Sequence, residues 1–337
     1  MTMLFTDGFD VGDFALKYEF SIVAGGTTAA TRFGTGLAYT YTSNGGTAGV
    51  LKKFFTASNK IIFGCAFKTV LNNDTSTVMQ VWGDGGVTQH LGLRFLTTGQ
   101  VVLVRGSTVI ATSVASGLVT VNTWAYWEMS ATIHDTTGSV EVRINGTPVI
   151  SFTGDTKNAG TATTIDAISW HQSGVTSATP SIDDLYILND LGSTNNNFLG
   201  DIRIQTLVPD GAGSVTQLSP LGVANNWDNV NEVPSSGADF NYSGTVGHRD
   251  LYSMTNLTAG TTVVFAVVPH IIARKTDSGV IAAKTALKHG ATVATGTTQT
   301  LGTSSDVYAT VHEINPSTGV AWTVGDLASL EAGVEVA

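Results

Sequence analysis

The sequence predicts an all-β protein made of two β-sandwich domains, and three observations lead to this fold class. Only 12% of the 337 residues are charged and 38 are glycine, which leaves little material for charged amphipathic helices. Short runs that alternate apolar and polar residues recur along the chain, with turn residues roughly every 8–12 positions. Each run has one apolar face, and a second sheet is needed to cover that face.

Residues 124–152 carry the clearest pattern and predict three consecutive antiparallel strands. The first run alternates apolar side chains such as Trp127 with polar ones such as Glu128, as a half-buried strand does. A turn at residues 135–138 follows, in which Gly138 is expected to take a positive φ. Asn145-Gly146 then predicts a type I′ hairpin, because that turn needs positive φ at both central residues.

Further strands are expected on both sides of this meander, at residues 18–23, 37–42, 49–55, 60–70, 77–82, 89–96, 100–105, 108–113, 164–171 and 181–190. The single cysteine, Cys65, lies within one of these apolar runs, so we expect a buried hydrophobic side chain. One cysteine also excludes a disulfide within the chain.

Four motifs in the first half resemble a known fold: Asp7-Gly8-Phe9-Asp10, Asn122-Thr123-Trp124, GSVEVRINGTPV at residues 138–149, and Ile182-Asp183-Asp184-Leu185-Tyr186. Together they look like the concanavalin A-like, laminin-G-type jelly roll. The resemblance covers residues 1–190. Residues 191–198 are small and polar and predict a linker.

Residues 199–337 predict a second β-sandwich. Its expected strands lie at residues 199–208, 250–254, 261–274, 279–289, 291–300 and 306–313, and the long run 261–274 is expected to be central. Thr323 and Asp326 have the spacing of a capping box, which predicts a short helix over residues 324–331 that Gly333 ends.

The second half also resembles a known family, on the stretches LGDIRIQTLVPDGAG, NNWDNVNEVP, HRDLY, ARKTDSG and NPSTGVAWTVGDLASLEAGVEVA. These are similar to the C-terminal module of tailed-bacteriophage virion proteins, which often follows a laminin-G-like domain. The resemblance implies a non-catalytic structural protein of capsid decoration, tail or fibre, and it supplies no catalytic residues. It also implies a homo-oligomer, for which a trimer is expected, with other virion proteins as partners.

Charge and hydropathy exclude several other classes. A net charge of −10 with no basic run argues against a nucleic-acid surface. The longest apolar segment, residues 263–273, is too short to cross a bilayer. The N-terminus has neither a basic stretch nor an apolar core, so no signal peptide is expected. These features predict synthesis in the cytoplasm, and the resemblance to phage proteins implies a host cell and a final place in the virion.

Glycan binding to a host surface is the alternative function, and it needs an exposed aromatic ring beside polar groups. Three combinations qualify: Trp82 with Asp84 and His90, Trp170 with His171, and Trp124 with Tyr126 and Arg143. For each ring, packing under a loop or against a neighbouring subunit competes with contact to a ligand.

Metal binding and hydrolysis are the remaining hypotheses. Asp183 and Asp184 are the candidate ligands for calcium, and the set Asn226, Asp228 and Asn231 is a weaker candidate. Strand caps and Asx turns explain both sets without a metal, and no cofactor is expected. A glycan-cleaving enzyme would need a pair of carboxylates, for which Glu128 and Glu141 are the candidates, but both are interpreted as solvated surface glutamates.

Overall fold

The computed structural model describes residues 3–12, 14–18, 20–21, 27–34, 36–41, 49–70, 73–172 and 179–337. The chain forms two compact units, the first made of residues up to Asp10 and Lys17–Ile204, the second of Val11–Leu16 and Gln205–Ala337. In both units nearly all of the regular secondary structure is antiparallel strand, which confirms the predicted all-β fold class. The first unit extends to Ile204, beyond the expected linker at residues 191–198.

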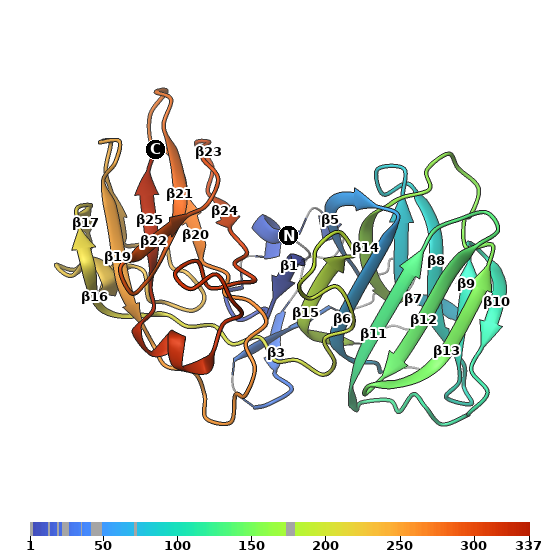
Figure 1. Cartoon of the computed structure of the whole chain (residues 1–337). Coiled ribbons are helices and arrows are strands. Elements are labelled where there is room, and N and C mark those ends of the chain that lie inside the picture. The colour runs from blue at the N-terminus through green and yellow to red at the C-terminus, as the bar shows by residue number, and fades with distance from the viewer. Residues whose placement is uncertain are drawn as a thin grey trace. The chain divides into compact units, whose positions relative to one another are not determined.

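Two antiparallel sheets build the first unit (Figure 1). Sheet A runs in the order β13 (Thr147–Gly154), β12 (Gly138–Ile144), β11 (Trp124–Thr132), β6 (Lys60–Lys68), β15 (Ser181–Asn189), β4 (Leu37–Thr40) and β3 (Thr27–Ala30), and β1 (Met3–Asp7) also pairs with β15. Sheet B runs in the order β10 (Thr108–Thr112), β9 (Val101–Arg105), β8 (Thr88–Phe95), β7 (Asn73–Gly83), β14 (Ile165–Gln172), β5 (Gly49–Ser58) and β2 (Phe20–Ser21). A single helical turn, α1 (Phe14–Lys17), follows β1.

Aromatic side chains from the two sheets fill the core between them. Phe95 of sheet B stacks on Trp127 of sheet A with ring centroids 4.8 Å apart. Trp170 of sheet B meets Phe63 of sheet A edge to face at 6.2 Å. Cys65 is fully buried, as predicted. The inner face of each sheet is therefore fixed, and alternate side chains point to the outer faces.

The central meander follows the sequence prediction closely. β11, β12 and β13 pair in antiparallel register, and Asn145 (φ 49°) and Gly146 (φ 78°) form the expected hairpin turn. The prediction of a positive φ at Gly138 is wrong. A Cβ at Gly138 would lie 1.9 Å from Oγ1 of Thr156, so glycine is needed there for a close approach of two segments.

The predicted strand at residues 199–208 is also wrong, because no strand forms there. Residues 198–204, here called the strap, cross the outer face of sheet A, and side chains of that sheet satisfy their backbone amides. Glu128 accepts a hydrogen bond from Gly200 N (2.8 Å), and Asp184 accepts one from Ile204 N (2.7 Å). Buried carboxylates thus accept the backbone hydrogen bonds that a neighbouring strand would accept if these residues formed the predicted strand.

The second unit is a six-stranded sheet with two separate two-stranded ribbons. The sheet runs in the order β16 (Pro209–Thr216), β19 (Arg249–Met254), β25 (Glu331–Val336), β21 (Ala282–His289) and β22 (Thr292–Thr295), with β23 (Gln299–Thr300) beside β21. The ribbons are β17 (Ser219–Leu221) with β18 (Phe240–Tyr242), and β20 (His270–Ala273) with β24 (Asp306–Ala309). Leu287, Trp322, Leu327 and Leu330 form a core cluster of this unit.

Two expectations for the second unit need correction. The run 261–274 is not a central strand, since only His270–Ala273 is extended and it lies in a ribbon. The capping box of Thr323 and Asp326 is confirmed, but the helix is a 3₁₀ turn, η2 (Val324–Ser329), with a second 3₁₀ turn, η1 (Asn226–Asn229), earlier in the unit. Gly333 ends no helix, because it lies inside the central strand β25.

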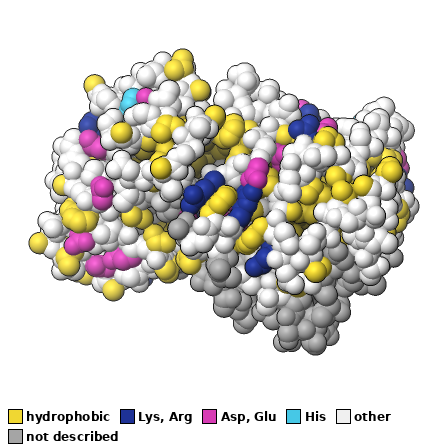
Figure 2. All heavy atoms as spheres, turned by 90° about the horizontal axis from the view of Figure 1, so that it is seen from below, with side chains coloured by type: hydrophobic (Ala, Val, Ile, Leu, Met, Phe, Trp, Pro, Cys, Tyr) yellow, Lys and Arg dark blue, Asp and Glu magenta, His cyan; other side chains and the backbone are white. Residues whose placement is uncertain are grey.

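The surface agrees with the low content of charged residues. Figure 2 shows that, on the face seen from below, charged side chains form small separate groups and hydrophobic ones lie scattered. Among the described residues, no helix has the length and hydropathy needed to cross a membrane.

Candidate functional site

Side chains on the outer face of sheet B form the candidate site. Strand register places them in rows, since residues paired across strands point to the same face. Because Trp170 points into the core, its neighbour Ser169 points outward, together with its partners Gln80 on β7 and Lys52 on β5. Trp82 pairs with Ala167 in the next row and therefore also points outward.

A chain of hydrogen bonds fixes the polar groups of this face. The indole Nε1 of Trp82 donates to Oγ of Ser169 at 2.8 Å, and that hydroxyl donates to Oε1 of Gln80 at 2.9 Å. Nε2 of Gln80 then donates to Oε1 of Gln89 at 3.3 Å. Nε2 of Gln89 is buried and has no hydrogen-bond partner in the part of the chain that the structure describes. The series therefore ends in a buried amide nitrogen, while the Trp82 and Gln89 side chains as a whole are half-buried.

Lys52 covers one face of the Trp82 ring. Its Nζ lies 4.0 Å from the ring centroid and donates to the carbonyl of Gly86. Asp166 accepts hydrogen bonds from the backbone amides of Gly85 (2.7 Å) and Gly86 (3.0 Å). Burial lowers the pKa of Lys52, and the charge of Asp166 opposes that shift. The ammonium is thus held by a carbonyl and a π-face.

Arg94 and His171 extend the face along β8 and β14. Nε of Arg94 lies 3.4 Å from Oγ1 of Thr77, and Nδ1 of His171 lies 3.3 Å from the carbonyl of Thr77. Both side chains are half-buried, and burial lowers the pKa of His171. The face thus combines an indole ring, two amides, a hydroxyl, an imidazole and two cations.

Only two of the five predicted glycan-binding residues, Trp82 and His171, belong to this face. Trp170 is fully buried in the core, so its ring cannot serve as the expected platform. His90 is also fully buried, and its Nδ1 accepts from the backbone amide of Asn158 at 3.2 Å. Asp84 accepts from Ala162 N at 2.9 Å.

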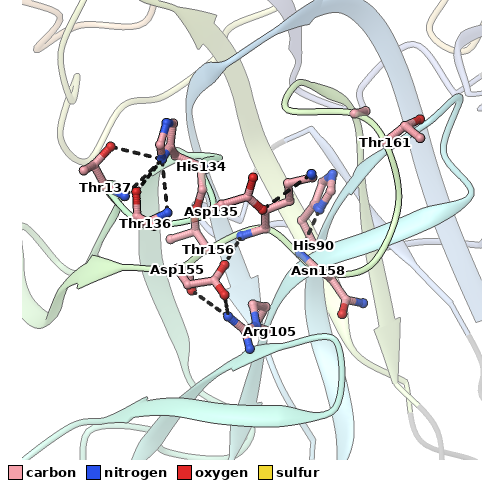
Figure 3. Close-up of polar contacts among 12 residues, drawn as sticks. His90, Arg105, His134, Asp135, Thr136, Thr137, Asp155, Thr156, Asn158 and Thr161 are labelled. Carbon is pink, nitrogen blue, oxygen red and sulfur yellow. Dashed lines mark hydrogen bonds and ion pairs between the residues drawn. The ribbon is translucent and has the colours of Figure 1, made fainter.

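Asp84 and His90 instead anchor residues 155–162, the segment that leads from β13 to β14 (Figure 3). Thr156 N donates to the carbonyl of His134, and Asp155 pairs with Arg105. The figure shows this segment fixed between the turn after β11 and the ends of β8 and β9. These polar residues have partners within the fold, which is the competing explanation that the sequence left open.

The third aromatic combination and the glutamate pair lie on the outer face of sheet A. Tyr126 is fully buried, and its hydroxyl donates to the carbonyl of Asp184 at 3.0 Å. Glu128 is only 1% exposed, so the interpretation of a solvated glutamate is wrong: it accepts from the hydroxyl of Tyr186 and from the strap. Glu141 pairs with Arg143 at 2.7 Å. No substrate could reach the Glu128 carboxylate in this arrangement.

Asp183 and Asp184 are buried and bind backbone amides. Oδ1 of Asp183 accepts from Asp184 N at 2.9 Å, and Asp184 lies 3.7 Å from the guanidinium of Arg32. Calcium takes six to eight oxygen ligands, which this pair does not supply. No group of three or more His, Cys, Asp or Glu side chains that could hold a metal occurs among the described residues. Asn226 donates to the carbonyl of Leu218, and Asn231 to Asp228 (3.1 Å).

This aspartate pair predicts a pH dependence of stability. Burial, with the charge of Asp184, raises the pKa of Asp183, and burial raises that of Asp184 despite Arg32. A carboxyl whose pKa is higher in the folded state binds its proton more tightly there, so stability is largest at low pH and falls as the pH rises above the ordinary carboxyl range.

We therefore expect Asp183→Asn to flatten the fall in stability between about pH 4 and 8. Urea unfolding at several pH values measures this slope, and Asp135→Asn, an exposed carboxyl of the same unit, is the control. An unchanged slope in Asp183→Asn would contradict the assignment.

Sequence reasoning missed Lys52, Gln80, Gln89, Arg94 and Ser169. Their residue types are ordinary for polar positions of a strand, and no motif joins them. The period-two pattern of residues 165–171 does contain one usable signal, since Trp170 and His171 must point to opposite faces. Which face is open depends on how β7, β14 and β5 pair.

No family model matches this sequence, and no curated protein matches it. Among solved structures, a sialidase is similar to 55% of this chain over 18% of its own length (13% identity, TM-score 0.39). Domain 4 of an extracellular GH43 arabinanase from Geobacillus stearothermophilus, in complex with arabinotriose, is similar to 56% of this chain over 92% of its length (17%, 0.36). The binding domain of Paraclostridial mosquitocidal protein 1 is similar to 56% of this chain over 48% of its own length (13% identity, TM-score 0.38). Values this low assign no ligand or activity.

Proposed function

We propose that this protein is a non-catalytic glycan-binding protein whose first unit binds sugar through the outer face of sheet B. The observation that carries the proposal is the hydrogen-bonded series Trp82, Ser169, Gln80 and Gln89. It holds a half-buried indole ring and the half-buried side chain of Gln89 in fixed orientation on one face of a rigid sheet. Sugar recognition uses this combination, in which a ring covers the apolar side of the sugar and oriented polar groups bind its hydroxyls.

A non-catalytic role is part of the proposal. Most glycoside hydrolases use two carboxyl groups that flank the scissile bond. Glu128 is enclosed by Tyr186 and the strap, and Glu141 is paired with Arg143. Asp166, a carboxylate close enough to Lys52 to affect its pKa, is bound by two backbone amides. Binding without turnover is the chemistry that this arrangement favours.

Replacing Trp82 with alanine is expected to weaken glycan binding strongly. The variant loses the ring face and breaks the donor to Ser169, and one such contact is worth about 1–3 kcal/mol, or roughly 5- to 150-fold in affinity. A glycan array followed by titration calorimetry measures the loss. Trp124→Ala is the matched control, since Trp124 is also half-buried beside a lysine, Lys68, but belongs to sheet A.

Two results would argue against glycan binding by this face. One is equal affinity of the Trp82→Ala variant and the wild type for an array glycan. The other is the absence of any bound glycan on the array, while circular dichroism shows that the wild type is folded.

Incorporation into a bacteriophage particle is the second function that we propose. It rests on the likeness of residues 199–337 to phage virion modules and on a chain with only 12% charged residues, which suits close packing of identical copies. In this role the second unit attaches to the particle or forms the oligomer, and the first unit presents the glycan-binding face. A density map of the particle tests this assignment, and the absence of the chain from purified particles would refute it.

A further inference from the structure

The geometry points to an anionic ligand: we infer that the outer face of sheet B binds a polysaccharide whose sugars carry carboxylates. This inference rests on the proposed glycan binding and adds the chemical class of the sugar. Its basis is the placement of Arg94 and Lys52 at two ends of the polar face, on β8 and β5.

Arg94 provides the stronger of the two arguments. A guanidinium has five N–H donors in a planar fork that matches a carboxylate. In Arg94, the described contacts involve only Nε, which faces the hydroxyl of Thr77 at 3.4 Å. No carboxylate among the described residues pairs with it, whereas Arg32, Arg105, Arg143 and Arg249 all have acidic partners. Its remaining donors suit an acid that comes from outside the fold.

Lys52 marks the other end of the face. Its row contains Lys52, Ser169, Gln80 and Gly92 on four adjacent strands, which spans about 14 Å at the usual strand spacing. Arg94 lies two residues beyond Gly92 on β8. Between the two cations lie Ser169 and Gln80, which are buried, and Gln89, which is half-buried. This spacing fits a ligand of several sugar units whose acidic groups recur along its length.

Because the chain is acidic overall, binding of a polyanion would depend on the two local cations, Lys52 and Arg94. At a net charge of −10 the chain repels polyanions at long range, so a polyanion can bind only where local cations outweigh that field. Asp166 offsets part of the charge of Lys52 and is itself bound by Gly85 N and Gly86 N. Arg94 forms no ion pair with any carboxylate whose side chain the structure describes. We therefore expect Arg94 to contribute more than Lys52 to the affinity.

The experiment compares two carboxylate polymers, polygalacturonate and polysialate, each with its carboxyl-reduced, neutral form. Titration calorimetry with the full chain is expected to give at least about tenfold tighter binding of a carboxylate form. Arg94→Gln should remove most of that preference, because it should weaken binding of the carboxylate form far more than binding of the neutral form. Lys52→Gln should reduce the preference less. Lys68→Gln, which removes the lysine over Trp124 on sheet A, is the matched control.

The outcomes separate this inference from the proposed function. Suppose that the acidic and neutral forms bind with equal affinity and that this binding is lost in Trp82→Ala. The inference of an anionic ligand would then be wrong, while the proposed glycan binding would stand. A preference for acid that survives in Arg94→Gln would overturn the assignment of this face. If neither form of either polymer binds, the inference is wrong. The glycan array then tests the proposed glycan binding independently.

Discussion

Deletion of residues 331–337 is expected to unfold the second unit completely. These residues contain β25, which lies between β19 and β21 in the centre of the sheet, with five residue pairs on one side and six on the other. Each ladder hydrogen bond contributes about 0.5–1.5 kcal/mol net, so losing both ladders exceeds the roughly 5 kcal/mol by which a marginal domain is stable. Differential scanning calorimetry should show that the transition of this unit has disappeared.

A variant that keeps the strand and removes its charges is the control for this deletion. Glu331 pairs with Lys288 at 2.6 Å, and Glu335 pairs with Lys284 at 3.4 Å and with Arg249. These pairs are partly exposed, so the double variant Glu331→Gln and Glu335→Gln should cost no more than about 1–2 kcal/mol. If it destabilises the unit as much as the deletion does, ion pairs rather than strand pairing hold the sheet together.

The same strand shows where sequence reasoning stops. Residues 331–336 alternate between glutamate, small and apolar side chains, and Gly333 suggests the end of a helix. In the structure a Cβ at Gly333 would lie 2.0 Å from the carbonyl of Asp250, so glycine is needed because two strands approach closely. That requirement comes from a strand about 80 residues away in the sequence, and a local pattern contains no information about it.

The meander of the first unit was predictable because its signals are local. The Asn145-Gly146 turn fixes the register of β12 and β13, and alternation then assigns each side chain to a face. The candidate site is a harder case. Trp82 and His171 have recognisable residue types, but Gln80, Gln89 and Ser169 become a site only through the pairing of β7, β8 and β14. Sequence therefore predicts the scaffold of the site better than its content.

The buried carboxylate of Asp250 has a second large expected effect. Asp250 is fully buried in β19, and its Oδ1 accepts from the backbone amides of Gln217 (2.6 Å) and Leu218 (2.9 Å). Its Oδ2 accepts from the amide of Asn226 (2.6 Å) and the hydroxyl of Tyr252 (3.0 Å). Burial raises the pKa of Tyr252, which keeps that hydroxyl a donor. One side chain thus fastens the segment between β16 and η1 to the sheet.

We expect Asp250→Ala to destabilise the second unit by about 3–5 kcal/mol, because a buried donor without an acceptor costs about 1–3 kcal/mol and the variant leaves several. Urea unfolding followed by a probe of this unit measures the loss. Asp210→Ala is the matched control: this exposed aspartate on β16 accepts a single hydrogen bond, from Ser253 at 2.8 Å, and its loss should cost less than about 1 kcal/mol. The loss of stability in Asp250→Asn should lie between those of the two alanine variants. The amide oxygen of asparagine still accepts hydrogen bonds, but its NH₂ group replaces the other carboxylate oxygen and faces groups that are themselves donors. Equal stability of Asp250→Ala and Asp210→Ala would mean that water satisfies these donors, and the segment would then be held by its apolar contacts alone.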